Sequence, residues 1–441
     1  MKIKPARRVR GRLRVPGDKS VSHRAGILAA LAEGVTRIEN FSTSQDCAST
    51  LACLVQLGVG IEREGTSVRV FGVGTEGLCA PASALDCGNS GSTMRLLAGV
   101  LAGQNFASEL TGDDSLRSRP MKRIIEPLEL MGARIRSEAG RAPLRIEGRR
   151  PLKAITYRMP IASAQVKSCV LLAGLLAQGR TEVIEEGGPT RDHTELMLDW
   201  LGVPLETSRV MKGDAVSEHF AINGPVSYAA RDLFIPGDIS SAAFFMAAAI
   251  MLPGSELELK DVGLNQTRSQ ILGAFAELHA DVLIDERHAV CHESVGTIRV
   301  RGGNELAPLR EGQSNVLRGS LIPQLIDELP MLSVVGTQVR GGLTIKDAKE
   351  LRVKESDRIA ATVSNLRRMG AAVEEYEDGL KISGPTRLRG ASLDAYSDHR
   401  IAMAFTVAAL IAEGESEIAG AECASVSFPE FFQLLETLVE R

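Results

Sequence analysis

The sequence predicts an α/β fold made of six copies of one βαβαββ unit in two domains, and three observations support it. Six apolar segments of helical length are each followed by a glycine and then by a short strand-like segment. Six amphipathic segments alternate with them along the chain. The motif PGDKS at Pro16–Ser20 returns as PGDIS at Pro236–Ser240, which indicates two related halves.

The apolar segments are predicted to be the buried helices of the two cores. A helix that is apolar on all sides has no face for water, so it must be enclosed by other elements. The glycine that follows each segment is typical of a helix end. The predicted helices are Arg24–Ala32, Thr93–Ala102, Gln165–Ala177, Ala242–Leu252, Met331–Val339 and Arg400–Ala412.

The amphipathic segments are predicted to be the second helix of each unit, and hairpins should follow them. The predicted helices are Asp46–Leu57, Lys122–Met131, Thr194–Leu201, Ser269–Leu278, Asp357–Met369 and Pro429–Leu438. Alternation of apolar and polar residues predicts a hairpin centred on Glu64-Gly65 and further hairpins near Ala139-Gly140, Lys212-Gly213, Arg287-His288 and Asp378-Gly379.

The sixth unit has no hairpin after its last helix, which bears on the domain boundaries. The segment Lys2–Val15 alternates apolar and basic residues, so we expect it to complete that unit. One domain would then span residues 19–236, and the other would combine residues 1–18 with 237–441. The chain would cross between them at the two Pro-Gly turns.

Composition excludes several classes of function. A net charge of −4 with 4% aromatic residues does not suit a protein that coats nucleic acid. The longest apolar run, Ala242–Leu252, is far shorter than the roughly 20 residues of a membrane helix. The basic amino terminus lacks the apolar core of a secretory signal, so we expect a cytoplasmic protein. The cysteines lack zinc-site spacing, so no metal is expected.

Basic residues concentrate where the predicted helices begin and in nearby loops. Helix amino termini and basic side chains both attract anions, so this pattern predicts a positive cleft for a small polyanion. Asp327 stands among them and could accept a proton from a substrate hydroxyl, although it could also simply cap a helix. The basic residues are Lys19, Arg24, Arg95, Arg119, Lys167, Arg191, Lys354, Arg358 and Arg400.

The two PGD turns differ in their polar residues. The first copy continues into Lys19, His23 and Arg24, whereas the second, at Pro236–Ser240, has no charge except its aspartate. If the two copies are structural twins, the additional polar groups of the first copy would be there for chemistry. This is the working hypothesis for the two turns.

Seven motifs together resemble the 5-enolpyruvylshikimate-3-phosphate synthase family over nearly the whole chain. They are PGDKSVSHR, GNSGSTMR, RSRPM, SAQVKS, RDHTE, LRVKESDR and SDHRIAM, and RDHTE, SAQVK and NQTR resemble its class II branch. The resemblance implies two inverse α/β domains, each of three βαβαββ units, with the active site in the interdomain cleft. It implies carboxyvinyl transfer from phosphoenolpyruvate to the 5-hydroxyl of 3-phosphoshikimate, in cytoplasmic aromatic amino acid biosynthesis.

The same resemblance implies roles for individual residues, and no cofactor or metal. For catalysis it implies Asp327, Glu355, Lys19 and Lys354, with Asp327 and Lys354 facing the 5-hydroxyl and Glu355 protonating the methylene carbon. For 3-phosphoshikimate it implies Lys19, Ser20, Arg24, Ser163, Ala164, Gln165, Arg191, Asp327 and Lys354. For phosphoenolpyruvate it implies Lys19, Asn89, Gly91, Arg119, Gln165, Arg358, His399 and Arg400.

Two positions bear on inhibitor and substrate binding. Many family members have a lysine near the carboxyl terminus that helps bind phosphoenolpyruvate, and Val426 stands in its place here. Glyphosate-tolerant class II members commonly replace the glycine at Gly91 with alanine, and this chain keeps glycine. We therefore expect glyphosate to enter the pocket and compete with phosphoenolpyruvate.

Two other enzyme classes share parts of this pattern. An enolpyruvyl transferase acting on UDP-N-acetylglucosamine has the same sixfold architecture, but it usually carries a reactive loop cysteine and lacks GDKS together with SAQ. An RNA-terminal phosphate cyclase is built from a similar repeat, but charge and aromatic content disfavour it. The partners expected are two small anionic substrates, with no nucleic acid or membrane, and a monomer is expected.

Overall fold

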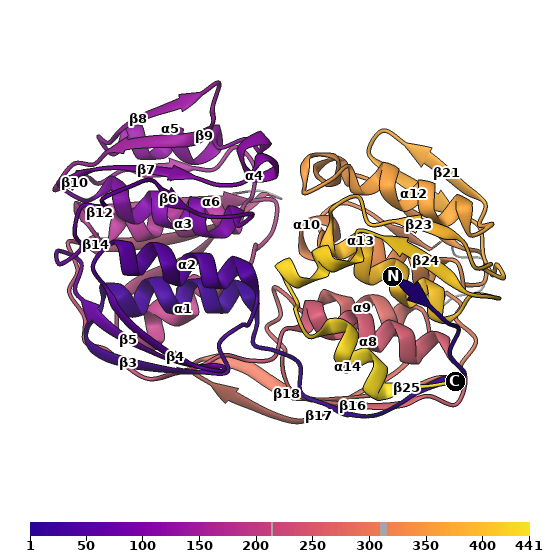
Figure 1. Cartoon of the computed structure of the whole chain (residues 1–441). Coiled ribbons are helices and arrows are strands. Elements are labelled where there is room, and N and C mark those ends of the chain that lie inside the picture. The colour runs from indigo at the N-terminus through magenta and orange to yellow at the C-terminus, as the bar shows by residue number, and fades with distance from the viewer. Residues whose placement is uncertain (213–214, 309–314) are drawn as a thin grey trace. The chain divides into compact units, whose positions relative to one another are not determined.

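The computed structural model describes residues 1–212, 215–308 and 315–441 and divides them into two compact units (Figure 1). Unit 1 comprises Met1–Pro16, Pro236–Ala289 and Ser294–Arg441, and unit 2 comprises Gly17–Ile235 and Val290–Glu293. The division at 16/17 falls inside the first PGD turn, and the division at 235/236 directly precedes the second. The tetrapeptide Val290–Glu293, which joins unit 2, was not anticipated from the sequence.

Three buried helices form the centre of unit 2. They are α1 (Lys19–Leu31), α3 (Gly91–Ala102) and α6 (Ala164–Gly174), and α3 packs against the other two. Helix α1 begins five residues before the predicted start at Arg24, because Asp18 caps it by accepting a hydrogen bond from the Val21 amide at 2.9 Å. The polar residues of PGDKSVSHR therefore lie in the first turns of a buried helix.

Within residues 17–212 and 215–235, unit 2 has three sheets of one design. In each, a short strand runs parallel to a central strand, which pairs antiparallel with a hairpin. The first contains β15 (Leu233–Phe234), β3 (Glu33–Glu39), β5 (Ser67–Val73) and β4 (Gly60–Glu64). The second contains β6 (Leu85–Asp86), β7 (Ala107–Thr111), β9 (Arg141–Glu147) and β8 (Arg134–Glu138). The third contains β10 (Leu152–Lys153), β11 (Thr156–Arg158), β12 (Ala177–Glu186), β14 (Ala215–Gly224) and β13 (Leu205–Lys212).

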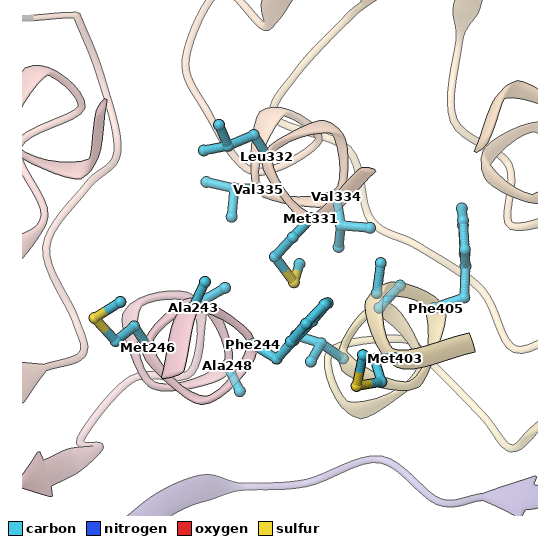
Figure 2. Packing of buried hydrophobic residues seen from close by; sticks show 14 of the residues in the cluster. Ala243, Phe244, Met246, Ala248, Met331, Leu332, Val334, Val335, Met403 and Phe405 are labelled. Atoms are coloured by element: carbon cyan, nitrogen blue, oxygen red, sulfur yellow. The ribbon is translucent and has the colours of Figure 1, made fainter. Parts of the chain in front are cut away.

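Unit 1 is also built around three buried helices, and two of its sheets contain the same arrangement of strands, whereas β1-β24-β23 has no hairpin among the described residues. They are α8 (Ile239–Met251), α11 (Leu329–Gly336) and α13 (His399–Leu410). Figure 2 shows them packed together through Phe244, Met331 and Met403. The sheets of its described residues are β17-β18-β16-β2-β25, β19-β20-β22-β21 and β1-β24-β23. Their strands are β17 (Asp281–Val290), β18 (Glu293–Arg301), β16 (Glu256–Gly263), β2 (Arg8–Leu13), β25 (Val439–Glu440), β19 (Val316–Leu317), β20 (Leu343–Ile345), β22 (Gly379–Ile382), β21 (Val373–Tyr376), β1 (Lys2–Ile3), β24 (Ser416–Ala419) and β23 (Ser392–Asp394).

The amphipathic helices lie close to their predicted positions, and short helices were missed. The former are α2 (Gln45–Gln56), α5 (Lys122–Leu130), α7 (His193–Trp200), α9 (Gln270–Glu277), α12 (Arg358–Arg368) and α14 (Phe431–Leu438). The latter are α4 (Asp114–Ser118), α10 (Leu321–Leu325), η1 (Lys349–Val353) and η2 (Ala421–Val426). No helix among the described residues is long and apolar enough to span a membrane.

One predicted hairpin is present with its turn displaced, and one cannot be compared in full. The turn expected at Arg287-His288 lies instead at Cys291-His292, because β17 continues to Val290 before the chain reverses. Of the predicted turn Lys212-Gly213, Gly213 lies outside the described residues.

The amino-terminal segment contributes to two sheets. β1 pairs antiparallel with β24, and β2 pairs parallel with β16. The basic side chains of β2 meet acidic partners: Arg10 lies 2.9 Å from Glu256 and Arg12 lies 3.4 Å from Glu258. The positive charge that the sequence concentrates here is therefore matched by acidic side chains on the neighbouring strand.

The two PGD turns are structural twins. An added Cβ on Gly17 would lie 1.8 Å from the carbonyl oxygen of Asn40, and one on Gly237 would lie 3.0 Å from that of Asp261. Asn40 and Asp261 share a left-handed backbone, with φ of 57° and 54°. Because a side chain would collide with the backbone at Gly17, glycine is required there.

Candidate active site

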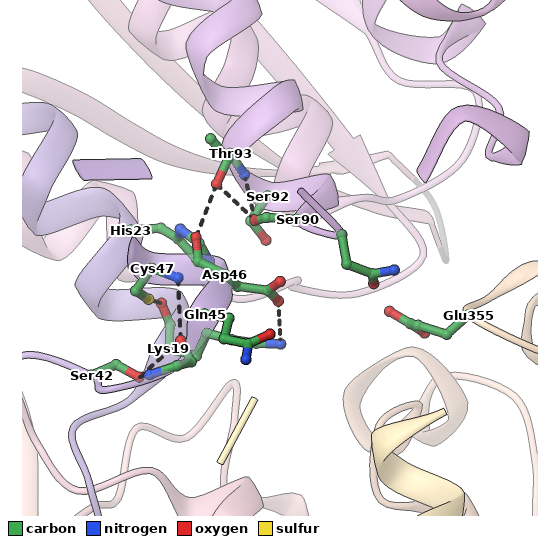
Figure 3. Close-up of polar contacts among 12 residues, drawn as sticks. Lys19, His23, Ser42, Gln45, Asp46, Cys47, Ser90, Ser92, Thr93 and Glu355 are labelled. Atoms are coloured by element: carbon green, nitrogen blue, oxygen red, sulfur yellow. Dashed lines mark hydrogen bonds and ion pairs between the residues drawn. The ribbon is translucent and has the colours of Figure 1, made fainter. Parts of the chain in front are cut away.

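Lys19 lies at the start of α1 with an acidic partner from α2. Its Nζ is 2.9 Å from Oδ2 of Asp46, a contact visible in Figure 3. The Lys19 side chain keeps 20% of its surface exposed, whereas Asp46 is buried. The ammonium group is therefore oriented by a buried carboxylate and can still contact an anion from solvent.

Arg24, one turn further along α1, is buried and held by three oxygens. Its Nε donates to Thr194 Oγ1 at 2.7 Å, one terminal nitrogen donates to the Ser20 carbonyl at 2.8 Å, and the other donates to Ser168 Oγ at 3.0 Å. Burial lowers the pKa of Arg24 to about 10; Glu195 opposes this shift, and the nearby cation of Arg191 adds to it. Two cations close enough to repel one another would be stabilised by a bound anion.

The RDHTE motif anchors the first turn of α7 to three other elements. His193 Nδ1 lies 2.6 Å from Glu293 Oε1, and Thr194 holds Arg24. Glu195 lies 2.7 Å from Lys167 Nζ, whose second partner is Glu185 at 3.0 Å. These consecutive side chains are buried, so the motif fixes the turn that follows Arg191.

The His193–Glu293 pair predicts a pH-dependent contribution to stability. Burial alone would lower the pKa of His193, but the Glu293 carboxylate raises it above its ordinary 6.5, while Asp18 raises it and Arg24 lowers it. Because the folded-state pKa is raised, the stabilisation is complete below pH 6.5 and is lost as pH rises through the folded-state value.

Glu293→Gln should therefore cost the most stability below about pH 6.5, and the cost should shrink at higher pH. Urea unfolding of both proteins across this range measures it. Asp199→Asn is the matched control, because Asp199 pairs with His292 at the same hairpin tip at 2.8 Å but both side chains are exposed. A cost for Glu293→Gln that does not vary with pH would contradict the prediction.

The amino termini of α3 and α6 bring four predicted residues together with Arg95. Arg119 donates to Asn89 Oδ1 at 2.7 Å, and Arg95 donates to Gln165 Oε1 at 2.7 Å. Gly91 lies between the two guanidinium groups: an added Cβ would be 2.7 Å from one Arg95 nitrogen and 3.6 Å from an Arg119 nitrogen. A small residue at this position leaves the guanidinium groups accessible to an anion.

Two further predicted residues open α6. Ser163 occupies the N-cap position, but its hydroxyl does not cap the helix, and Ala164 is the first helical residue. The Gln165 amide donates to Ser92 Oγ at 3.0 Å, which fixes its orientation. The free amide groups of this helix start suit a negatively charged group.

In unit 1, Arg358 is surrounded by three carboxylates. Its guanidinium nitrogens lie 2.7 Å from Glu355, 2.8 Å from Asp398 and 3.6 Å from Asp327. Burial by itself would lower the pKa of Arg358, but Asp398, Glu355 and Asp327 together raise it. The permanent charge therefore holds two candidate catalytic carboxylates, from separate segments of the chain, at one point.

The remaining predicted residues of unit 1 have other partners. Asp398 caps α13 by accepting from the Arg400 amide at 2.8 Å, and the Arg400 side chain donates to Ser240 Oγ at 2.5 Å. His399, the first residue of α13, is buried. Lys354 donates to Glu350 at 3.0 Å and is not among the residues that contact Arg358.

Comparison with known proteins gives one consistent result. The family model described as EPSP synthase (3-phosphoshikimate 1-carboxyvinyltransferase) matches residues 3–435. The chain belongs to the EPSP synthase family. The relative from Koribacter versatilis, a 3-phosphoshikimate 1-carboxyvinyltransferase, is 48% identical over 446 residues, covering 100% of this chain and 99% of the relative. The one from Synechococcus sp. is 49% identical over 443 residues, covering 99% and 96%.

Solved structures of EPSP synthases agree with the observed fold. The EPSP synthase of Acinetobacter baumannii, 39% identical, superposes with a TM-score of 0.85 over 99% of this chain and 98% of its own. The enolpyruvyl transferase NikO of Streptomyces tendae, 18% identical, superposes with a TM-score of 0.74 over 99% and 96%, a likeness of fold alone. The predicted α/β fold and the predicted family are therefore confirmed.

Sequence reasoning missed several buried polar residues of this EPSP synthase family member. Ser240, Arg268 and Glu328 form a hydrogen-bonded group in contact with Arg400. Glu328 directly follows Asp327, and Arg268 ends the NQTR motif, so both adjoin segments that were singled out. Their contact could not be recognised because the three residues are far apart in the chain.

Proposed function

We propose that this chain is a 3-phosphoshikimate 1-carboxyvinyltransferase and that the residues described above carry out the reaction. It transfers the carboxyvinyl group of phosphoenolpyruvate to the 5-hydroxyl of 3-phosphoshikimate and releases phosphate. Apart from family membership, the observation that carries the proposal is the contact of Arg358 with both Asp327 and Glu355. One guanidinium thereby orders a candidate base and a candidate acid.

The reaction has an addition step and an elimination step. Asp327 removes the proton of the 5-hydroxyl while the oxygen of that hydroxyl bonds to C2 of phosphoenolpyruvate. Glu355 delivers a proton to C3. The product of this step is a tetrahedral ketal phosphate. In the elimination step, the Glu355 carboxylate takes a proton back from C3 while the C2–O bond to phosphate breaks, and the departing phosphate takes up the proton held by Asp327. The products are the enolpyruvyl ether and inorganic phosphate. Atoms balance without an oxidant or a reductant.

The residues of unit 2 bind mainly through charge. Lys19, Ser20 and Arg24 take the phosphate of 3-phosphoshikimate, with Ser163, Ala164, Gln165 and Arg191 assigned to the same substrate. The charge of Arg191 lowers the pKa of Arg24, which supports this assignment because a dianionic phosphate would relieve the repulsion between the two cations. Lys19 contributes to both substrates.

Phosphoenolpyruvate is assigned to a second set of cations. In unit 2 these contacts come from Lys19, Asn89, Gly91, Arg119 and Gln165, and in unit 1 from Arg358, His399 and Arg400. Lys354 is assigned to the 5-hydroxyl, and its ammonium group has further N–H donors besides the one that bonds Glu350. Val426, where many family members have lysine, ends η2, and its side chain has no donor for a phosphate.

The proposal is tested by phosphate release from a mixture of 3-phosphoshikimate and phosphoenolpyruvate. We expect stoichiometric phosphate and enolpyruvyl product. UDP-N-acetylglucosamine in place of 3-phosphoshikimate should release none. Absence of phosphate with the first acceptor, from protein shown to be folded, would end the proposal.

The same assay tests the expectation for glyphosate. With Gly91 unsubstituted, no methyl group crowds the Arg95 guanidinium, so glyphosate should compete with phosphoenolpyruvate. Rates measured at several phosphoenolpyruvate concentrations should show that glyphosate raises the apparent KM for phosphoenolpyruvate and leaves kcat unchanged. Uncompetitive inhibition, or none, would contradict it.

We also expect a monomer, to be measured by light scattering.

A further inference from the structure

The guanidinium group of Arg400 is hydrogen-bonded to Ser240 of the second PGD turn. Its guanidinium donates to Oγ of Ser240 at 2.5 Å and to the carbonyl oxygen of Ser240 at 3.4 Å, and it lies over the ring of Phe244 with a centroid distance of 5.8 Å. Ser240 is completely buried in the first turn of α8. The guanidinium is thus held by side chains from a helix other than its own.

The Ser240 hydroxyl has a second, acidic partner. It donates to Oε1 of Glu328, and Arg268 donates to the same oxygen at 2.9 Å. Glu328 is 2% exposed and is positioned at the start of α11, directly after Asp327. Because a hydroxyl has one hydrogen, donation to Glu328 leaves a lone pair of Ser240 Oγ directed at Arg400. The carboxylate therefore sets the direction of the Arg400 contact.

The turn itself is fixed by Asp238. One carboxylate oxygen accepts from the Ser240 amide at 2.9 Å, and the other accepts from the Ser241 hydroxyl at 2.9 Å. Arg268 approaches Asp238 at 3.9 Å, so it connects the cap of α8 with Glu328. Two buried carboxylates and two buried guanidinium groups balance in charge, which makes the network tenable in a core.

We propose that Ser240, oriented by Glu328, is a positioning residue for Arg400 and thereby for the phosphoenolpyruvate anion, an inference that rests on the proposed function. This proposal extends the working hypothesis, which gave a chemical role to the additional polar groups of the first PGD copy, to a serine of the second copy. Ser20 of the first copy accepts from Arg24 through its carbonyl, and Ser240, its twin, accepts from Arg400. Each copy therefore supports one anion-binding arginine.

Ser240→Ala and Ser241→Ala form a matched pair of variants. Each removes one buried hydroxyl from the same helical turn, but only the Ser240 hydroxyl contacts Arg400. Ser240→Ala should raise the KM for phosphoenolpyruvate about tenfold, in keeping with the loss of a hydrogen bond to a charged group. The KM for 3-phosphoshikimate should change by less than about twofold. Ser241→Ala should leave both values near wild type while lowering the melting temperature similarly.

The relay through Glu328 is tested by a double-mutant cycle. Glu328→Gln should also raise the KM for phosphoenolpyruvate, and adding Ser240→Ala to it should have little further effect, because both act on one contact. Additive effects would overturn the relay. Equal KM values in the two serine variants, or a similar rise for both substrates, would overturn the positioning role.

A second measurement separates this inference from the proposed function. Phosphoenolpyruvate should raise the melting temperature of wild type and of Ser241→Ala more than that of Ser240→Ala. If wild type releases no phosphate but phosphoenolpyruvate still raises its melting temperature more than that of Ser240→Ala, the proposed function fails and the role of Ser240 stands. If all three proteins respond equally, the role of Ser240 fails, and the phosphate assay judges the function separately.

Discussion

Asp327→Ala should lower turnover by about two to four orders of magnitude, the usual contribution of a general base, and leave substrate binding nearly unchanged. The fold should tolerate the change, because Asp327 is the most exposed of the three carboxylates at Arg358 and its contact, at 3.6 Å, is the longest. Phosphate release gives kcat, and calorimetry with 3-phosphoshikimate gives the affinity.

Asp327→Asn is the control for this experiment, because it keeps the shape and removes the charge. It should lose turnover as Asp327→Ala does if the carboxylate is the base. Near-normal turnover in either variant would remove Asp327 from that role. Weak binding combined with normal turnover at saturation would make it a binding residue instead.

Arg358→Met should cost about 3–5 kcal/mol of unfolding free energy, because it leaves the buried Asp398 carboxylate without this cation. Asp398 is fully buried, and Glu355 and Asp327 would repel it and one another. Turnover should fall as well, since the candidate acid and base lose their common partner. Denaturant unfolding gives the first quantity and phosphate release the second.

Arg352→Met is the matched control. Arg352 also meets two carboxylates, Asp357 at 2.7 Å and Glu375 at 3.0 Å, but all three side chains are partly exposed. Partly exposed ion pairs contribute about 0–1 kcal/mol, and Arg352 also donates to the carbonyl oxygens of Glu377 and Tyr376 at 2.7 Å. This variant should therefore lose clearly less stability than Arg358→Met. Equal losses in the two variants would contradict the special position assigned to Arg358.

The buried helices were predictable because their signal is local. A run of apolar residues ended by glycine must be enclosed wherever it occurs, and α3 and α8 were found within a few residues. The start of α1 was missed because Lys19 and the residues after it were interpreted as a polar turn ahead of the helix, whereas the helix begins at Lys19. The charges of Lys19 and Arg24 are offset by Asp46 and by the oxygens around Arg24, and those contacts come from other elements.

The candidate site was predictable to the extent that its residues belong to contiguous motifs. RDHTE, SAQVK and LRVKESDR each place several polar residues in one turn, so the motifs marked Arg191, Gln165 and Glu355 directly. Glu328 and Ser240 carry no such signal. In the sequence, Glu328 is typical of a residue that precedes a helix, and Ser240 is typical of a serine in the first turn of a helix.

The sequence by itself therefore determined the repeated α/β unit, the buried helices and the family, because each follows from a periodicity or from motifs within short stretches. The catalytic residues that the family resemblance implies stay a prediction. Only the tertiary structure decided which of these residues meet. Packing of α8, α11 and α13 brings Ser240, Glu328 and Arg400 together from positions 88 and 160 residues apart. In the same way, the tip of a hairpin from the second half of the chain supplies Glu293 to His193. Hydrogen bonds depend on distances in space, and local sequence patterns do not encode those distances.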